Sequence, residues 1–392
     1  MGFARTGKIV RPTWPEGSLI MSNSVTVNSA YIRGSEAVPV TVTASIAPGF
    51  PSLDIVGVPD RFAGEECSRI RCGAGSAGYE IPRGIVTVAI EQERGFATRD
   101  ISCHGLAIAY AVLLASGQIP EALVDELGGT MLYGCINLDG SVSRCGGEVA
   151  VQRLAERLGM RPLFASGSEV IAGGACLGVS NLRDLACGDA RFTRIAPVEP
   201  TRMPLPSQCA SPLADDLVDA IRCAVGAGRG IAVVGGSDAQ REAIVSTVYR
   251  LMGELPEVQR PERAALSSIT GQSVADAVGG IRPIVWCDDR TMPRDLIGGG
   301  RPVRPGCITQ AHGGILVCDI ARSRVNELAW WLRGPIADKS ATVVRVDWAF
   351  AMPSDFLPVF FFPDADANRK ACCMSDLDLL EVRPVEVCAP VI

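Results

Sequence analysis

The sequence predicts a two-part chain, with an α+β domain first and an α/β domain with a buried parallel sheet second. Strand-like alternation recurs through residues 24–90, with helical patterns after it. Two short apolar runs, Ile231–Val234 and Gly314–Asp319, are typical of strands buried on both faces of a parallel sheet. The first run stops at glycines and the second ends in an acid, which is the outline of a phosphate-binding α/β domain.

Composition and charge indicate a protein with well-filled cores and no global attraction to polyanions. The chain has 392 residues, 47% hydrophobic and 20% charged, with a mean hydropathy of +0.23. Its net charge of −6 provides no overall basic field for nucleic acid, although a local basic patch stays possible. The fifteen cysteines include no C-x-x-C, and there are only two histidines. We therefore expect no metal site, and free, mostly buried thiols in a reducing cytosol.

Nothing in the sequence favours export or a membrane. Residues 1–20 have basic residues and chain breakers but no apolar core, and we expect a leader that is non-native or poorly ordered. The longest apolar stretch, Leu106–Ala115, is too short to cross a bilayer. We expect a cytoplasmic protein without a membrane partner.

Hydrophobic periodicity predicts the elements of the first domain, residues 21–191. Strands are expected at 24–33 and 38–46 as a hairpin, within 48–60, and at 85–90 and 131–138. Helices are expected at 61–76, 106–116 and 148–158. Residues 192–213, rich in Pro and Ser and without periodicity, are expected to be a linker.

The second domain, residues 214–392, is expected to alternate helices and strands. Helices are predicted at 214–225, 241–252 and 325–332. Strands are predicted at 231–234, within 280–287, and at 314–319, 342–346 and 359–362, with a possible edge strand in 382–392.

Several segments, in order along the chain, resemble magnesium-chelatase-like proteins of the ComM/YifB type. They are PGFPSLDIVGVPD (48–60), LLASGQIP (113–120), INLDGSVSRCGGEV (136–149), GGGRPVRPGCITQAHGGILVCD (298–319) and ELAWWLRGPIADKSATVVR (327–345). The resemblance covers most of residues 22–373. It implies a Lon-protease-like N-terminal domain of the ribosomal-protein-S5 type, followed by a P-loop NTPase-like AAA+ domain that would bind ATP and Mg²⁺.

The phosphate loop departs from the family pattern G-x-x-x-x-G-K-[ST]. The matching stretch runs from Gly235 and Gly236 to Arg241, which replaces the lysine that neutralises phosphate. Asp238 and Gln240 replace the flexible glycines, and Glu242 replaces the hydroxyl that binds Mg²⁺. Two added carboxylates in a turn that should wrap a polyanion oppose nucleotide binding.

The second motif keeps its metal-binding acid, Asp319, but has Ile320 where the family has a catalytic glutamate. By alignment, Pro363 stands in place of an asparagine, and Asp288 and Asp289 in place of paired histidines. The chain ends before a helical lid and its arginine would appear. We therefore expect Gly235, Gly236, Arg241 and Asp319 to form a vestigial nucleotide site, with no catalytic residue and no cofactor. Mg²⁺ would bind Asp319 only if the site still takes up ATP.

The fold relatives of the first domain include Ser-Lys peptidases. Alignment places their nucleophile at Ser102-Cys103-His104 and their lysine near Val149. Neighbouring Cys and His side chains rarely face each other, and valine is inert, so we expect a structural loop-to-helix junction and no peptidase.

A local basic cluster is the candidate contact to nucleic acid. Arg301 and Arg304, with Arg290 and Arg294 nearby, lie in glycine- and proline-containing loops and could touch DNA. A solvated loop is the simpler interpretation. Of the Trp330-Trp331 pair, we expect one ring in the core and the other on a contact surface.

Three functions stay open at this point. The first is a non-catalytic (pseudo-ATPase) paralogue that acts as an assembly, regulatory or DNA-processing subunit, in a homo-oligomer or with an intact AAA+ homologue. The second is an ATP-binding motor on DNA, of the competence or branch-migration type, with weak ATPase. The third is a DNA-binding module without a motor.

Overall fold

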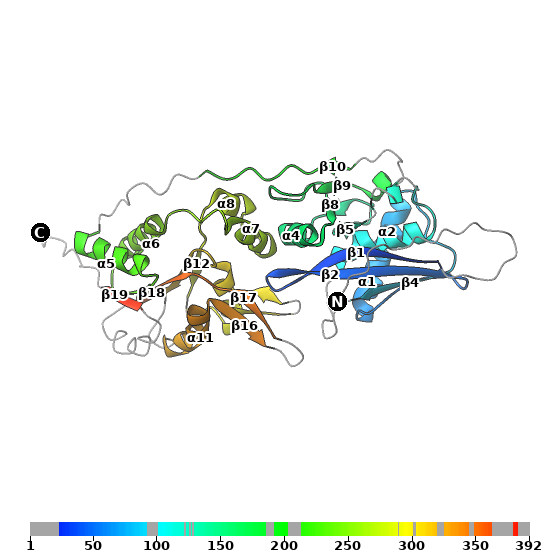
Figure 1. Ribbon diagram of the computed structural model, residues 1–392. Helices are drawn as coiled ribbons and strands as arrows, with labels where there is room; N and C mark the ends of the chain where they lie inside the picture. The colour runs from blue at the N-terminus through cyan, green and yellow to red at the C-terminus, as the bar shows by residue number, and fades with distance from the viewer. Residues whose placement is uncertain are drawn as a thin grey trace, which may run out of the picture. The chain divides into compact units, whose positions relative to one another are not determined.

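The computed structural model describes residues 23–91, 101–120, 123–124, 127, 129–185, 192–202, 213–288, 290–300, 303–319, 325–344, 349–362 and 379–382. The chain divides into two compact units, Met1–Val198 and Glu199–Ile392. Each unit has its own main sheet and its own core (Figure 1).

Unit 1 is a mixed sheet packed against helices. Its strands are β1 Asn23–Arg33, β2 Glu36–Ala47, β3 Ser52–Val56, β4 Ile85–Glu91, β5 Thr130–Leu132, β6 Cys135–Ile136, β7 Val142–Ser143, β8 Arg161–Ala165, β9 Leu177–Val179 and β10 Thr193–Arg194. Its helices are α1 Asp60–Ser76, α2 Gly105–Ala115 and α4 Glu148–Leu158, with 3₁₀ turns η1 Ser102–His104 and η2 Leu182–Leu185.

The main sheet of unit 1 has eight strands in the order β10-β9-β8-β5-β1-β2-β4-β3. The predicted hairpin is confirmed, because β1 and β2 pair antiparallel with Arg33 opposite Glu36. Between them Gly34 takes a φ of 61°, which suits the tight turn. The core lies between this sheet and helices α1 and α2, and every residue of α2 except Leu114 is buried.

Two predictions for unit 1 need correction. The strand expected at 131–138 is two short strands, β5 and β6, interrupted at Gly134. A Cβ on Gly134 would lie 2.9 Å from Val142, and its N–H bonds to the carbonyl of Cys103, so the chain leaves the sheet here. In addition, the stretch expected to be a linker begins with β10, which pairs with β9.

Unit 2 alternates strands and helices. Its strands are β11 Gly230–Val234, β12 Ile284–Cys287, β13 Gly298–Gly299, β14 Arg304–Pro305, β15 Ile315–Asp319, β16 Ser340–Val344, β17 Ala349–Pro353, β18 Leu357–Phe362 and β19 Leu379–Val382. Its helices are α5 Asp215–Gly226, α6 Asp238–Met252, α7 Arg260–Thr270, α8 Val274–Gly279, α9 Pro293–Ile297, α10 Cys307–Gln310 and α11 Val325–Asp338.

The main sheet of unit 2 is fully parallel, in the order β12-β15-β18-β11-β19. The three strands β15, β18 and β11 are buried on both faces, which explains their unbroken apolar sequences, whereas Ile284 and Trp286 of the edge strand β12 are exposed. Val233, Val317 and Phe361 pack on one face beneath α5 and α6. Phe360 and Phe362 face the opposite side, where α10 and α11 cover them.

Helices α7 and α8 were not expected from periodicity, although local signals for α7 are present. Pro261 lies in its first turn, and Gly271 ends it with a φ of 74°. The sheet also includes β19, which ends at Val382, while residues 383–392 of the predicted edge strand lie outside the described part.

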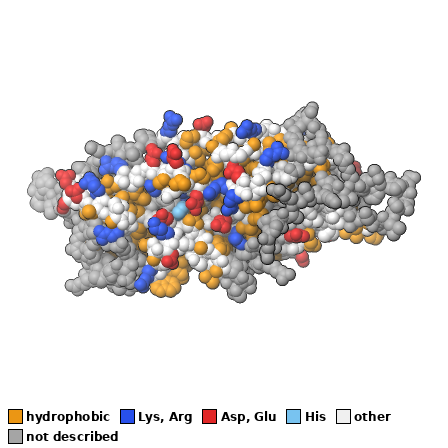
Figure 2. Space-filling view, viewed as in Figure 1, with side chains coloured by type: hydrophobic (Ala, Val, Ile, Leu, Met, Phe, Trp, Pro, Cys, Tyr) orange, Lys and Arg blue, Asp and Glu red, His pale blue; other side chains and the backbone are white. Residues whose placement is uncertain are grey.

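The described surface mixes charges of both signs. Lys/Arg and Asp/Glu side chains are interspersed over the face drawn in Figure 2, with no extended area of one sign. The ten described cysteines form no disulfide, but only four of them are buried, fewer than expected. Among the described residues no helix combines the length and apolar character needed to span a bilayer.

The tryptophan pair has one partly buried ring at the core, which agrees with the prediction, and one exposed ring. Trp331 packs against the core under α11, while Trp330 is 70% exposed. The two rings meet edge to face, with their centroids 4.7 Å apart.

Candidate functional site

The predicted glycine turn and the predicted acid lie at the same edge of the parallel sheet. β11 and β15 both pair with β18, which lies between them. Gly235 and Gly236 follow β11 directly, with φ of 78° and 86°, and Asp319 is the last residue of β15. The N–H of Gly235 donates to the carbonyl of Phe362 at 2.8 Å. The carboxyl ends of these strands therefore place the sequence-predicted residues together.

Arg241 and Asp319 form an ion pair across this edge. Nη1 of Arg241 lies 3.3 Å from each carboxylate oxygen of Asp319. The arginine side chain is 17% exposed and the aspartate side chain 50%. The guanidinium carbon lies 5.5 Å from the centre of the Phe361 ring, a cation–π distance. The positive charge expected to meet phosphate is thus directed at the acid expected to hold a metal.

The segment aligned with the phosphate loop is partly helical. Helix α6 begins at Asp238, three residues before the predicted start at Arg241. Ser237 Oγ accepts a hydrogen bond from the N–H of Gln240 at 3.4 Å, and Gln240 Oε1 accepts one from the N–H of Ser237 at 2.9 Å. This reciprocal capping box explains why α6 begins earlier than predicted, because it stabilises a helix start at residue 238.

The capping box uses backbone N–H groups that a phosphate would need. In a phosphate-binding loop, successive unpaired N–H groups point at the anion. Here the N–H groups of Gly235, Ser237 and Gln240 already have acceptors inside the protein. An anion entering this turn would have to displace those acceptors.

The two carboxylates added to the loop are exposed at the start of α6. Asp238 and Glu242 both lie on its first turns and face solvent. Negative charge there favours the helix N-terminus. It also repels a nucleotide triphosphate approaching the same turn.

The remaining positions at which the sequence departs from the family pattern add little to the description of this site. Ile320, Pro363 and Asp289 lie outside the described residues. Asp288 is exposed, and a hydrogen bond from the N–H of Arg290 at 2.9 Å lowers the pKa of its carboxyl. No group of three or more His, Cys, Asp or Glu side chains in the described part of the chain could hold a metal ion.

Of the predicted nucleic-acid cluster, Arg301 lies outside the described residues. Arg304 is exposed on β14, and Arg290 is exposed in the turn after β12. Arg294 is also exposed and lies 3.5 Å from Asp295. These arginines remain available to a partner, but nothing in their geometry selects one.

In unit 1 the region aligned with a peptidase nucleophile is structural. His104 is fully buried, and its Nδ1 lies 2.9 Å from Ser29 Oγ. Ser29 Oγ donates to the carbonyl of Leu132 at 2.9 Å, so it accepts from the imidazole, whose proton is thereby assigned to Nδ1. Val149 is fully buried in α4. The imidazole is therefore anchored to the core hydroxyl of Ser29 and has no solvent-exposed surface, which favours a structural role.

Two contributors to the site were not singled out from the sequence. Phe361, which lies against the Arg241 guanidinium, reads only as one of several apolar residues in β18. The capping box had a visible signal, since Ser237-Asp238-Ala239-Gln240 has the S-x-x-Q form that starts helices.

Comparison with known proteins supports the resemblance in both units. A sequence profile described as "Magnesium chelatase, subunit ChlI" matches residues 215–373. A second profile, "Subunit ChlI of Mg-chelatase", matches residues 42–168. YifB of Escherichia coli strain K12 is 24% identical over 348 residues, covering 86% of this chain and 67% of YifB. Protein Rv2897c of Mycobacterium tuberculosis H37Rv is 26% identical over 365 residues, covering 89% and 69%.

Solved structures give only a distant likeness. NtrX from Brucella abortus is 17% identical, with a TM-score of 0.30, over 45% of this chain and 36% of NtrX. Its complex with ADP matches with a TM-score of 0.28 and 18% identity, over 43% and 35%. The two profiles and the relatives aligned along most of the chain place it in the magnesium-chelatase-like family of the YifB type.

Proposed function

We propose that this chain is a non-catalytic, pseudo-ATPase member of its family that acts as an assembly, regulatory or DNA-processing accessory subunit. The observation that supports this best is the Arg241–Asp319 ion pair beside a phosphate loop closed by its own capping box. Unit 2 would be a degenerate AAA+ domain, and unit 1 a Lon-protease-like domain without peptidase chemistry.

Nucleotide binding at this site would have to undo several native interactions. Opening the capping box costs about 1 kcal/mol, and separating a partly exposed ion pair costs up to about 1 kcal/mol. Each such cost lowers affinity by about tenfold at most. Repulsion from Asp238 and Glu242 adds to this, and Arg241 would have to leave the Phe361 ring. Because these costs add up, we expect weak ATP binding or none.

The retained framework argues for a role in assembly. Both sides of the parallel sheet in unit 2 have filled cores, and unit 1 has a separate one. A packed framework retained beside an altered phosphate loop suggests that a surface, and not a reaction, is being maintained. We propose that the partner is another copy of this chain or an intact member of the same family.

Calorimetry with ATP and Mg²⁺ tests the lost site directly. We expect no binding heat from the native chain at submillimolar ATP. A variant that restores the loop chemistry, Asp238→Gly/Gln240→Gly/Arg241→Lys/Glu242→Thr, should gain affinity at least tenfold. Adding Asp319→Ala to this variant should remove the Mg²⁺-dependent part of the gain.

One result of this calorimetry would contradict the proposal. Micromolar ATP affinity in the native chain, with turnover abolished by Asp319→Ala, would overturn the proposal and favour an ATP-binding motor. The assembly role has its own test, which is co-purification with an intact family member. A chain that stays monomeric with every such homologue would contradict that role.

A DNA contact is the remaining alternative, and Arg304 is its described candidate. If DNA binds there, the shift of labelled duplex should weaken with salt and with Arg304→Ala. No shift at low salt removes this alternative.

A further inference from the structure

A pocket in unit 2 lies away from the site above. Its volume is ≈ 400 Å³, and helices α6, α7 and α8 and the segment entering β12 line it. Cavities of this size are typical of small-molecule sites. The lining contains hydroxyls, such as those of Ser246 and Tyr249, and an apolar wall that includes Ile281 and Pro283. Its charged side chains are Arg263, Arg282 and Asp276.

Arg263 is a buried cation for which the described part of the chain provides no anionic partner. The residue is 3% exposed. Its Nη1 donates to the carbonyls of Gln310 at 2.9 Å and His312 at 3.5 Å, and its Nη2 donates to the amide oxygen of Gln272. A guanidinium has five N–H donors, so the Nε–H and one Nη2–H have no acceptor among the described residues. A buried charge that contacts only neutral groups is unfavourable unless a ligand or water accepts its remaining hydrogen bonds.

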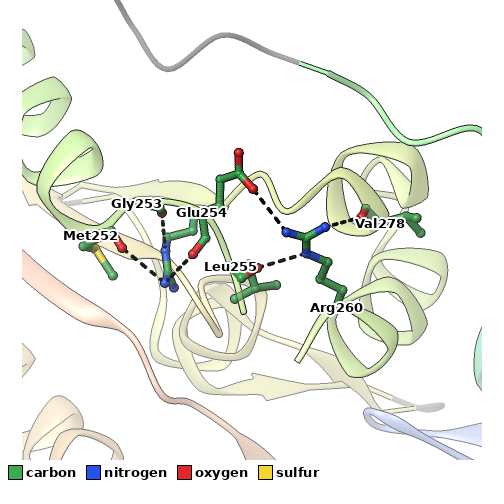
Figure 3. A network of polar contacts seen from close by, with 7 residues as sticks. Met252, Gly253, Glu254, Leu255, Arg260 and Val278 are labelled. Atoms are coloured by element: carbon green, nitrogen blue, oxygen red, sulfur yellow. Dashed lines mark hydrogen bonds and ion pairs between the residues drawn. The ribbon is translucent and has the colours of Figure 1, made fainter. Parts of the chain in front are cut away.

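The neighbouring Arg260, in contrast, has a carboxylate partner as well as carbonyl acceptors. Its Nε and Nη1 donate to the carbonyls of Leu255 and Val278, and its Nη2 lies 3.1 Å from a carboxylate oxygen of Glu254 (Figure 3). Arg260 and Arg263 lie one turn apart on α7. The one outside the pocket lining has a carboxylate, and the one in the lining has none.

Arg282 adds a second positive charge to the lining. It donates to the carbonyls of Met252, Gly253, Glu254 and Gly313. In the described part of the chain, no carboxylate lies within ion-pair distance of it. The lining therefore has two arginines and one aspartate, none of them in an ion pair. The net charge of the pocket lining is positive.

We propose that this pocket is a binding site for a small organic anion, a carboxylate or a phosphate monoester, whose acidic group accepts hydrogen bonds from Arg263. The apolar part of the ligand would lie on Ile281 and Pro283. Asp276 would weaken binding by repulsion and so limit the affinity. This site is independent of the nucleotide-like site, because none of its lining residues contacts Arg241 or Asp319 in the ion pair described above.

The test is calorimetry of the full chain with two probes, inorganic phosphate and benzoate, at constant ionic strength in chloride. Arg263→Lys should weaken binding at least tenfold, because lysine cannot keep the carbonyl bonds and also meet the anion. Arg260→Lys is the matched control on the same helix and should change affinity less than twofold. Asp276→Asn should tighten binding at least threefold.

Two further variants keep the outcome decisive. Ser246→Trp fills the pocket from α6 and should abolish binding. This variant tests whether the anion binds in the pocket even if Arg263→Lys fails to fold. Arg241→Ala should leave binding unchanged, which separates this site from the vestigial one. Binding of phosphate alone identifies a phosphate ester, and binding of benzoate identifies a carboxylate. No heat with either probe, or heat that Ser246→Trp leaves intact, overturns the proposal.

Discussion

The guanidinium of Arg241 lies 3.3 Å from both carboxylate oxygens of Asp319, although the two residues are 78 positions apart. One follows the first strand of the parallel sheet in chain order, and the other ends a strand two positions away in that sheet. In a phosphate-binding domain these two places hold a phosphate contact and a metal contact, bridged by the ligand. Here each side chain neutralises the other.

This ion pair should contribute to folding. Asp319→Asn leaves a mostly buried guanidinium without its partner, and the free energy of unfolding should fall by about 1 kcal/mol, since the acid is half exposed. Urea unfolding measures it. A double-mutant cycle with Arg241→Met should return a coupling of the same sign. The exposed pair Arg222–Asp219 is the control, and Asp219→Asn should change stability by less than about 0.5 kcal/mol.

If the Asp319 carboxylate were unpaired and free to bind a metal ion, its substitution would affect stability differently. If Asp319→Asn is neutral or stabilising, the carboxylate is not held by Arg241 in solution. The site would then be open, and the pseudo-ATPase proposal would lose its main support.

The capping box should stabilise the start of α6. Ser237→Ala removes the acceptor for the Gln240 N–H and should lower the free energy of unfolding by about 1 kcal/mol. Ser237→Asp keeps an acceptor at the same place and should cost less than half as much. Amide hydrogen exchange at residues 238–241 should accelerate in Ser237→Ala only. Equal exchange in all three proteins would mean that the turn is not helical.

Sequence patterns were sufficient where one strong local rule applied. Alternation in β1 and β2 predicted a hairpin, and the all-apolar runs of β11 and β15 predicted a buried parallel sheet. Because parallel strands end at the same edge, the location of Gly235 and Asp319 at one edge of the sheet followed from those two predictions.

The failures occurred where a local signal was passed over or where contacts are long-range. Residues 237–240 have the S-x-x-Q form of a capping box, but periodicity alone placed the start of α6 three residues late, at Arg241. Arg263 is bonded to the carbonyl of Gln310, 47 residues away, which no periodicity can reveal. Gly134 looks like any strand glycine until its close approach to Val142 is known.

Two glycines of α1 should respond oppositely to the same substitution. A Cβ on Gly73 would lie 2.7 Å from the carbonyl oxygen of Asn137, so Gly73→Ala forces helix and turn apart and should destabilise unit 1. Gly64 is exposed, with nothing within 4 Å of its Cβ position. Gly64→Ala should therefore stabilise by roughly 0.5–1 kcal/mol through helix propensity. Thermal unfolding of both variants decides, and a shared sign would contradict the close packing of α1 on this turn.

Acid should weaken unit 2 through His312. Burial lowers the pKa of this imidazole below its usual 6.5, and nearby Arg263 acts in the same direction, while Glu262 and Asp355 oppose it. Its Nδ1 accepts a hydrogen bond from the N–H of Asp355 at 3.1 Å, which requires that nitrogen to be unprotonated. The folded state therefore binds fewer protons than the unfolded chain. Stability is full above the unfolded pKa of about 6.5, falls as pH drops below it, and levels off once the folded imidazole is protonated.

The measurement is urea unfolding between pH 5 and pH 8, beside proton NMR of the imidazoles. Only two histidines exist, so their signals can be assigned with one variant. His312→Asn keeps an acceptor for the Asp355 N–H without a titrating group, and the stability of this variant should depend less on pH across that window. His104 is present in both proteins, so the difference between the two curves isolates His312. If the native imidazole titrates at or above 6.5, or the two curves have equal slopes, His312 is not held neutral by burial.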